Sequence, residues 1–252
     1  MPKVLLVGIS IGDAYTEKYN NLFRESQEYY ATKHGYDFKV CTTHLDPNLQ
    51  LYETTSFNKA LVGCQEWSNN YDFIVFLDSD ILINRNAPAI HTYMDYEDCI
   101  GIVDEFSQPS KERRLRIHNR LGWEKSATEY YKLAGYDLQT DIGFNTGMFI
   151  IQPKLHGDLL KNTYNKYVHN SITHWRGFHY EQSSIGYEIQ KSKKYKILDN
   201  KFNALWPIFK LDNIENYTLE QYFENNYFVH FAGKGDHDKV YELYQRHKQR
   251  NH

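Results

Sequence analysis

The chain has 252 residues, enough for one large domain or two small ones. Hydrophobic residues make up 41% of it and charged residues 24%, a globular balance that excludes intrinsic disorder. The formal net charge is −3, so no overall basic field attracts nucleic acid, and we expect no nucleic-acid partner.

The sequence contains no stretch near the roughly 20 apolar residues that span a bilayer. Its first apolar run, residues 4–7, is too short for the core of a signal peptide and predicts a strand instead. The cysteines lie far apart and form no CxxC pair, which is typical of a reducing compartment. These features predict a cytoplasmic location.

The N-terminal part alternates between predicted strands and helices. Residues 3–9 form a nearly continuous apolar run, the pattern of a strand buried on both faces. Helical spacing of apolar residues over 19–30, followed by His34 and Gly35, predicts a helix with a stop. Residues 36–40 and 73–77 predict two more strands, and Ser56 is expected to cap a helix between them. The buried face of that helix would carry Phe57, Ala60, Leu61 and Cys64.

This order predicts an α/β fold with an open, mostly parallel sheet flanked by helices, whose N-terminal half is Rossmann-like. In the C-terminal part, strands are predicted at 99–103, 147–151 and 227–231, and helices at 155–168 and 181–191. Residues 239–250 predict an amphipathic surface helix, for which weak peripheral membrane contact is an alternative. Between residues 107 and 140 the chain is polar, and its lysine and arginine cluster predicts a solvated helix face or a mobile lid.

Asp78-Ser79-Asp80 directly follows the predicted strand 73–77. Ligands bind such sheets beyond the carboxyl ends of the strands. Residues two apart on a strand share a face, so both carboxylates could converge on one hard cation. Carboxylates, phosphate oxygens and one imidazole together suit Mn²⁺ or Mg²⁺. The alternative is a solvated loop, in which Asp and Ser are common turn residues.

Known phosphate-binding loops are missing, because the chain has neither GxxxxGK[ST] nor GxGxxG spacing. The segment His230-Phe-Ala-Gly233-Lys234 offers an imidazole, a glycine and a lysine within five residues. Together they could supply a metal ligand and a clamp for a diphosphate. The alternative is a surface turn rich in Gly and Asp.

Four short motifs occur in order: Asp78-Ser79-Asp80, Asn145-Thr146-Gly147, Tyr180-Glu181-Gln182 and His230-Phe-Ala-Gly233. Their order resembles the retaining glycosyltransferases of the GT-A fold. The sequence is similar to the glycogenin and lipopolysaccharide galactosyltransferase group, and closer to the xyloglucan xylosyltransferase and galactomannan galactosyltransferase group. Residues 29–37 and Lys59 add to the second likeness. The likeness is weakest over residues 107–140.

The resemblance implies one domain over residues 1–252, with a nucleotide-sugar half (about 1–105) and an acceptor half (about 106–252). It implies that Asp78, Asp80 and His230 hold Mn²⁺ or Mg²⁺, which bridges the phosphates of a UDP-sugar. Further donor contacts are expected from Gly8, Ile9, Ser10, Tyr15, Lys59, Ser79, Asn145, Gly147, Gly233 and Lys234, with Lys239 as the alternative to Lys234. Phe202, Asn203 and Trp206 resemble an acceptor-side motif.

The resemblance also implies that Glu181 and Gln182 lie beneath the anomeric carbon of the donor. The activity expected is transfer of a sugar to a hydroxyl of a glycan or another acceptor, with retention and by front-side attack. Two other classes stay open. One is a haloacid-dehalogenase-like phosphohydrolase, with Asp78 as nucleophile and Asp80 as acid/base. The other is a non-catalytic module that binds a nucleotide or a carbohydrate. No oligomeric state is predicted.

Overall fold

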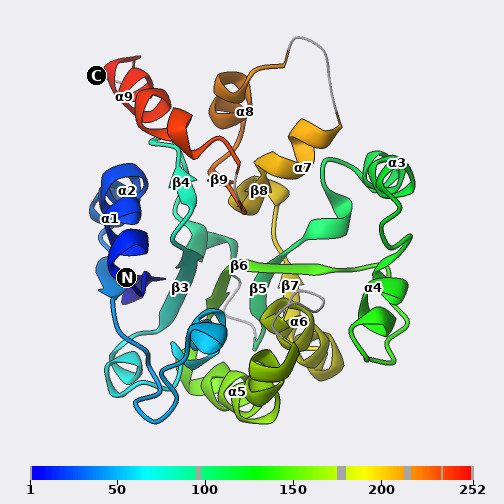
Figure 1. The fold of residues 1–252 in the computed structure, drawn as a ribbon. Helices are drawn as coiled ribbons and strands as arrows, with labels where there is room; N and C mark the ends of the chain where they lie inside the picture. Colours follow the sequence, from blue (N-terminus) through cyan, green and yellow to red (C-terminus); the bar gives the residue numbers. More distant parts are fainter. Residues whose placement is uncertain (1, 95–97, 175–179, 213–216, 234, 251–252) are drawn as a thin grey trace.

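A six-stranded sheet in the order β2-β1-β3-β6-β5-β7 forms the centre of the computed structural model (Figure 1). The structure describes residues 2–94, 98–174, 180–212, 217–233 and 235–250. The strands are β1 (Val4–Ile9), β2 (Asp37–Cys41), β3 (Phe73–Asp78), β5 (Ile100–Asp104), β6 (Phe144–Ile151) and β7 (Tyr195–Ile197). β1 pairs in parallel with β2 and β3, and β5 pairs in parallel with β7. β6 is antiparallel to both β3 and β5, so the sheet is mixed but mostly parallel, as expected.

The apolar runs become strands because both faces of the sheet are covered. Leu5 and Val7 of β1 face a core shared with η1 (Tyr52–Leu61), α5 (Pro153–His174) and α6 (Tyr180–Ser192). Val4 and Leu6 face a second core shared with α2 (Arg24–His34), β4 (Ile81–Ile83) and β9 (Phe228–His230). Alternate residues of one strand therefore enter two different cores, which explains why no polar residue interrupts β1.

Two predicted helices differ from expectation. The helix predicted over 19–30 is two helices, α1 (Asp13–Leu22) and α2, separated at Phe23. The Phe23 ring is buried, with its centroid 6.0 Å from that of Phe231, so the break lets this ring enter the core. The segment expected to be capped by Ser56 is the 3₁₀ helix η1, which begins at Tyr52 and has no side-chain cap. The capping prediction was therefore wrong.

A small second sheet positions the C-terminal part of the chain beside Asp80. It consists of β4 (Ile81–Ile83), β9 (Phe228–His230) and β8 (Ala204–Leu205), in the order β4-β9-β8. β9 runs antiparallel to β4, with His230 opposite Ile81. The Phe231 N–H donates to the Asp80 carbonyl at 2.9 Å. The sequence predicted this strand but not its separate sheet.

The remaining helices lie along the top and the right of the view (Figure 1). They are α3 (Lys111–Leu121), α4 (Ala127–Leu133), α7 (Trp206–Leu211), α8 (Leu219–Asn225) and α9 (Val240–Arg250). α9 buries Val240, Leu243 and Tyr244 against the core that contains Phe23, as its amphipathic pattern predicted. Short 3₁₀ segments are η2 (Glu66–Asn70), η3 (Ile90–Tyr93), η4 (Glu105–Ser107), η5 (Asn200–Asn203) and η6 (His237–Lys239). Across the described residues, no helix combines the length and the apolar character needed to cross a membrane.

Candidate active site

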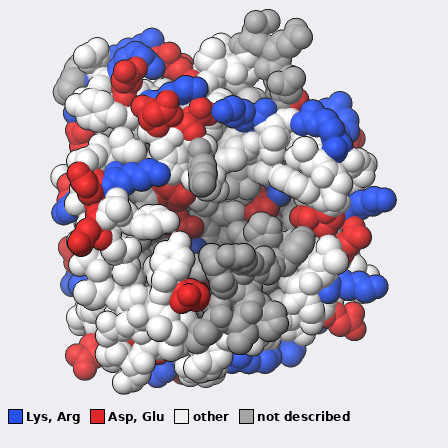
Figure 2. Space-filling model, in the orientation of Figure 1, with Lys and Arg blue, Asp and Glu red and all other residues white. Residues whose placement is uncertain are grey.

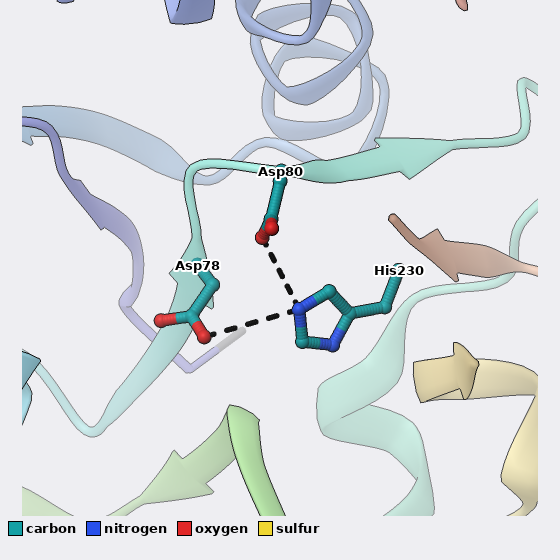
Figure 3. Close-up of side chains that lie close together, drawn as sticks. All are labelled: Asp78, Asp80 and His230. Carbon is teal, nitrogen blue, oxygen red and sulfur yellow. Dashed lines mark ion pairs between the residues drawn. The ribbon is translucent and has the colours of Figure 1, made fainter. Parts of the chain in front are cut away.

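Asp78, Asp80 and His230 come together where β3, β4 and β9 meet (Figure 3). One ligand atom of each residue lies within 4.8 Å of the others. His230 Nε2 is 3.1 Å from Asp80 Oδ1 and 4.0 Å from Asp78 Oδ2. The two aspartates do not share one strand, because β3 ends at Asp78 and a turn follows. Their carboxylates nevertheless point toward the same imidazole nitrogen.

The orientation of His230 is set by its other nitrogen and by a missing side chain. Nδ1 is 3.0 Å from Asn203 Oδ1, and this amide oxygen can only accept, so Nδ1 carries the proton. Nε2 therefore faces the carboxylates, where it can bind a cation or, when protonated, donate to Asp80 Oδ1 at 3.1 Å. A Cβ on Gly147 would lie 2.3 Å from His230 Cε1 and 2.8 Å from Nδ1. Gly147 is therefore required to leave space for the ring.

Asp78, Asp80 and His230, called the metal group below, fit a divalent metal. Two carboxylates and one imidazole, held by a second hydrogen bond, are a common donor set for Mn²⁺. Burial lowers the pKa of His230, but the carboxylates of Asp80 and Asp78 raise it by more, so the net shift is upward. Burial raises the pKa of Asp78, whereas His230 outweighs burial at Asp80 and lowers its pKa. A cation at Nε2 would take the place of the proton that these carboxylates attract.

Lys59 joins the metal group to α6. Its side chain is only 5% exposed, and its Nζ lies 2.9 Å from Asp78 Oδ1 and 3.1 Å from Glu181 Oε1. Burial lowers the pKa of Lys59, but the two carboxylates raise it above its usual value. Glu181 is thus held in an ion pair with Lys59, on the Asp78 side of α6.

Replacing Lys59 by methionine should destabilise the fold by about 3 kcal/mol, because Asp78 and Glu181 would lose their common counter-charge. We expect the lower end of the range for broken buried pairs, since the Asp78 side chain is 29% exposed. Urea unfolding of the metal-free protein measures this loss. The double variant that also carries Glu181→Gln should lose less unfolding free energy than the two single variants lose together. Strict additivity would show that the Lys59–Glu181 contact does not stabilise the fold.

A cavity of about 580 Å³ opens beside the metal group. Asp78, Asp80 and His230 line it, together with Gln182 and Asn145. Figure 2 shows acidic side chains deep in a hollow near the centre of this face. Asn145 Nδ2 donates to Gln182 Oε1 at 3.1 Å, and its Oδ1 accepts from Asn203 Nδ2 at 2.8 Å. One chain of hydrogen bonds therefore runs from His230 through Asn203 and Asn145 to Gln182.

Glu105 and Arg114 also line this cavity, and sequence reasoning missed both as site residues. Glu105 Oε2 accepts from Asn145 Nδ2 at 2.9 Å and from Gln182 Nε2 at 3.1 Å. Its Oε1 accepts from Arg114 at 2.5 Å. An available signal was the place of Glu105 two residues beyond the strand predicted at 99–103, at its carboxyl end.

The solvated-face interpretation of the basic cluster in 107–140 was wrong for Arg114. Lys111, Arg116 and Arg120 are exposed over α3, where Figure 2 shows basic side chains at the upper right. Arg114 is instead buried and paired with Glu105, and Arg113 is paired with Asp212. Arg114 lies on the face of α3 that turns inward with Ile117 and His118, and Glu105 pairs with it there.

A second cavity of about 350 Å³ lies next to the first. It is lined by Ile9, Ser10, Tyr15, Ser79 and Glu181, all of which were expected to contact the donor or its sugar, and by Tyr52 and Ser56. Neighbouring residues of the chain thus line different cavities. Asp78 and Gln182 line the larger one, whereas Ser79 and Glu181 line the smaller one. Gly8 lies inside the sheet, between Val40 and Leu77.

The glycine-rich segment after β9 is described only in part. Gly233 lines the larger cavity and has a φ of 76°, a conformation that favours glycine. Lys234 lies outside the described residues. Lys239 Nζ pairs with Asp236 Oδ1 at 2.8 Å. Trp206, expected on the acceptor side, is buried and donates from Nε1 to Asp236 Oδ2 at 2.8 Å.

Solved structures of glycosyltransferases share this fold. One is a glycosyltransferase involved in glycosylation of the major capsid of PBCV-1, with 16% identity, a TM-score of 0.61, and coverage of 97% of this chain and 100% of that one. The galactosyltransferase LgtC, in complex with donor and acceptor sugar analogues, has 12% identity, a TM-score of 0.59, and coverage of 96% and 95%. The bifunctional glycosyltransferase WbbM has 13% identity and a TM-score of 0.57, and the match covers 97% of this chain but 52% of WbbM.

These likenesses confirm the GT-A fold expected from the sequence. No protein-family model matches the sequence, and no curated protein matches it. The likeness to the xyloglucan xylosyltransferase and glycogenin groups stays a prediction.

Proposed function

We propose that this chain is a metal-dependent glycosyltransferase. It would move a sugar from a nucleotide-sugar, in the first place a UDP-sugar, to a hydroxyl of a glycan or another acceptor, with retention of configuration. The observation that carries the proposal is the meeting of Asp78, Asp80 and His230 on the wall of the larger cavity. The same fold in glycosyltransferases supports it, as does the LgtC complex with sugar analogues.

The two adjacent cavities suggest how the donor would bind. The smaller one has two exposed tyrosines, Tyr15 and Tyr52, whose rings could pack against the flat face of a base. The hydroxyl of Tyr15 bonds to Tyr52, which raises the pKa of Tyr15. The diphosphate would then cross the metal group near Ser79 and Gly233. The sugar would enter the larger cavity beside Gln182 and Asn145.

The reaction breaks the bond between the anomeric carbon and the diphosphate oxygen and forms a bond to the acceptor oxygen. A divalent ion at Asp78, Asp80 and His230 would offset the negative charge on the leaving diphosphate. In front-side attack, the acceptor proton passes to the diphosphate oxygen, so no protein base is required. Retention is supported by the sequence resemblance to retaining enzymes.

The amide oxygen of Gln182 is proposed to face the anomeric carbon and to stabilise the positive charge that it gains in the transition state. Asn145 and Glu105 hold both ends of its amide, so Gln182 Oε1 stays fixed relative to the cavity. Glu181 contributes less directly, because Lys59 binds its carboxylate and Glu181 lines the smaller cavity.

The experiment is to incubate the protein with a panel of UDP-, GDP- and CMP-sugars, with Mn²⁺ or with EDTA, and to measure release of the nucleotide. Turnover of at least one UDP-sugar that needs Mn²⁺ is expected. An NMR assignment of the anomeric product tests retention, and an inverted product would remove the role of Gln182.

Two other outcomes would favour the alternative classes. Phosphate release from p-nitrophenyl phosphate without sugar transfer would favour the phosphohydrolase. The position of the Asp motif argues against that class, because it follows the third strand of the chain, whereas that class carries it on the first. Binding of UDP with neither transfer nor hydrolysis of any donor would indicate a non-catalytic module.

A further inference from the structure

The larger cavity has a second end, formed by residues other than the metal group. It is lined by Gly122, Trp123 and Glu124 from the turn after α3, by Leu133 of α4, and by Pro207 and Ile208 of α7. Figure 1 shows α3 and α4 on the right, across the molecule from β3 and β4, between which Asp80 lies. We therefore expect a donor bound at the metal group to leave the side of the cavity formed by α3 and α4 free.

Trp123 presents an aromatic surface at this end. Its side chain is 42% exposed although it lines a cavity. Gly122 ends α3 with a φ of 68°, and the Trp123 N–H donates to the His118 carbonyl at 2.9 Å. The rings of Trp123 and His118 meet edge to face, with centroids 5.3 Å apart. The indole is thus held by a helix end and by a buried ring, and is not carried on a free loop.

The same turn is tied to the polar groups beside Gln182. Arg114 Nε donates to His118 Nε2 at 2.5 Å, so His118 carries its proton on Nδ1, which donates to the Glu124 carbonyl at 2.5 Å. Arg114 also donates to Glu105, which accepts from Gln182. This hydrogen-bond chain fixes the distance from the indole to Gln182.

α7 closes the opposite side of this end. Arg113 of α3 pairs with Asp212, which follows α7, and Arg120 donates to the Leu211 carbonyl. Pro207 and Ile208 therefore face the cavity from a helix that is bound to α3. Apart from Glu124, the residues that form this end are apolar, aromatic or glycine, and the carboxylate of Glu105 and the amides of Asn145 and Gln182 line the same cavity.

We propose that this end of the cavity is the acceptor subsite, and that it binds a pyranose ring packed against Trp123. The C–H face of a pyranose is apolar and slightly positive, so it complements the negative face of an indole. Its hydroxyls would reach the polar floor at Glu105, Asn145 and Gln182. The term acceptor rests on the proposed glycosyl transfer, whereas binding of the sugar itself does not.

Binding can be tested without any donor. We would record saturation-transfer difference NMR on the whole chain with methyl β-D-galactopyranoside, methyl β-D-glucopyranoside and methyl α-D-mannopyranoside. At least one sugar should give signals, strongest on the C–H protons of one ring face. Trp123→Leu keeps an apolar side chain but removes the aromatic face, and should weaken binding by about tenfold. Trp123→Phe should weaken it less.

Tyr241→Ala is the matched control, because it removes an aromatic side chain that is 56% exposed on α9. Its sugar signals should equal those of the unmodified protein. Unchanged binding in Trp123→Leu, or no signal from any of the three sugars, would overturn the subsite.

The same experiments distinguish failure of the proposed function from failure of the subsite. Sugar binding that depends on Trp123, with no turnover of any nucleotide-sugar, would leave the subsite standing and remove glycosyl transfer. Transfer in which Trp123→Leu keeps the acceptor KM would leave the function standing and remove the subsite. If both hold, Trp123→Leu should raise the acceptor KM by about tenfold and leave the donor KM unchanged.

Discussion

Replacing Asp80 by asparagine is expected to weaken Mn²⁺ binding by about a hundredfold or more and to abolish turnover with it. Loss of partners that only orient metal ligands already costs about 10–100-fold in affinity, so loss of a ligand should cost at least as much. Asparagine keeps the size of the side chain, and the Phe231 N–H bonds to the backbone of residue 80, so the fold should survive. Isothermal titration with Mn²⁺ and thermal melting measure both effects.

Asp238→Asn is the matched control for this variant. It removes one carboxylate from the same region of the fold, but Asp238 is exposed on η6 and lies outside the metal group. Its affinity for Mn²⁺ should equal that of the unmodified protein. If Asp80→Asn bound Mn²⁺ with unchanged affinity, the three side chains would not form a metal site.

Replacing Gly147 by alanine should displace His230, although residue 147 contributes no ligand atom. The new methyl group would lie 2.3 Å from His230 Cε1, and β6 is buried along its whole length. The methyl would also lie 2.8 Å from Nδ1, the nitrogen that bonds to Asn203, so the ring cannot move away without disturbing that hydrogen bond. Overpacking of this kind costs about 1–3 kcal/mol of unfolding free energy. Affinity for Mn²⁺ should fall by at least about tenfold.

Gly8→Ala controls for the addition of a methyl group to a buried strand. A Cβ at residue 8 would meet no atom closer than 3.7 Å, so the urea midpoint and Mn²⁺ affinity should stay near those of the unmodified protein. Equal behaviour of the two alanine variants would contradict the steric role of Gly147.

The site was predictable where its residues directly follow a strand in the chain. Asp78 and Asp80 were found because they follow an apolar run at the edge where ligands bind such sheets. Glu105 has the same relation to β5 and could have been found by the same rule. The partners of Lys59 could not, since Asp78 and Glu181 reach it from β3 and α6, and no spacing connects those segments.

Arg114 illustrates a second limit. It lies among basic residues on a polar helix, and only its pairing with Glu105 distinguishes it from exposed Arg116 and Arg120. A buried charge needs a partner, but that partner belongs to another element. Local composition therefore predicted the helix face without predicting which arginine faces inward.

The sequence by itself determined the strands β1 and β3 and the part of β6 from Gly147 to Ile151, because a strand covered on both faces needs an apolar run. It also determined the acidic motif after β3 and the amphipathic helix α9. Only the tertiary structure decided that β6 runs antiparallel, that β9 pairs with β4, and that Gly147 makes room for His230. Those outcomes depend on which distant segments pair and pack, and neither hydrophobic period nor motif spacing contains that information.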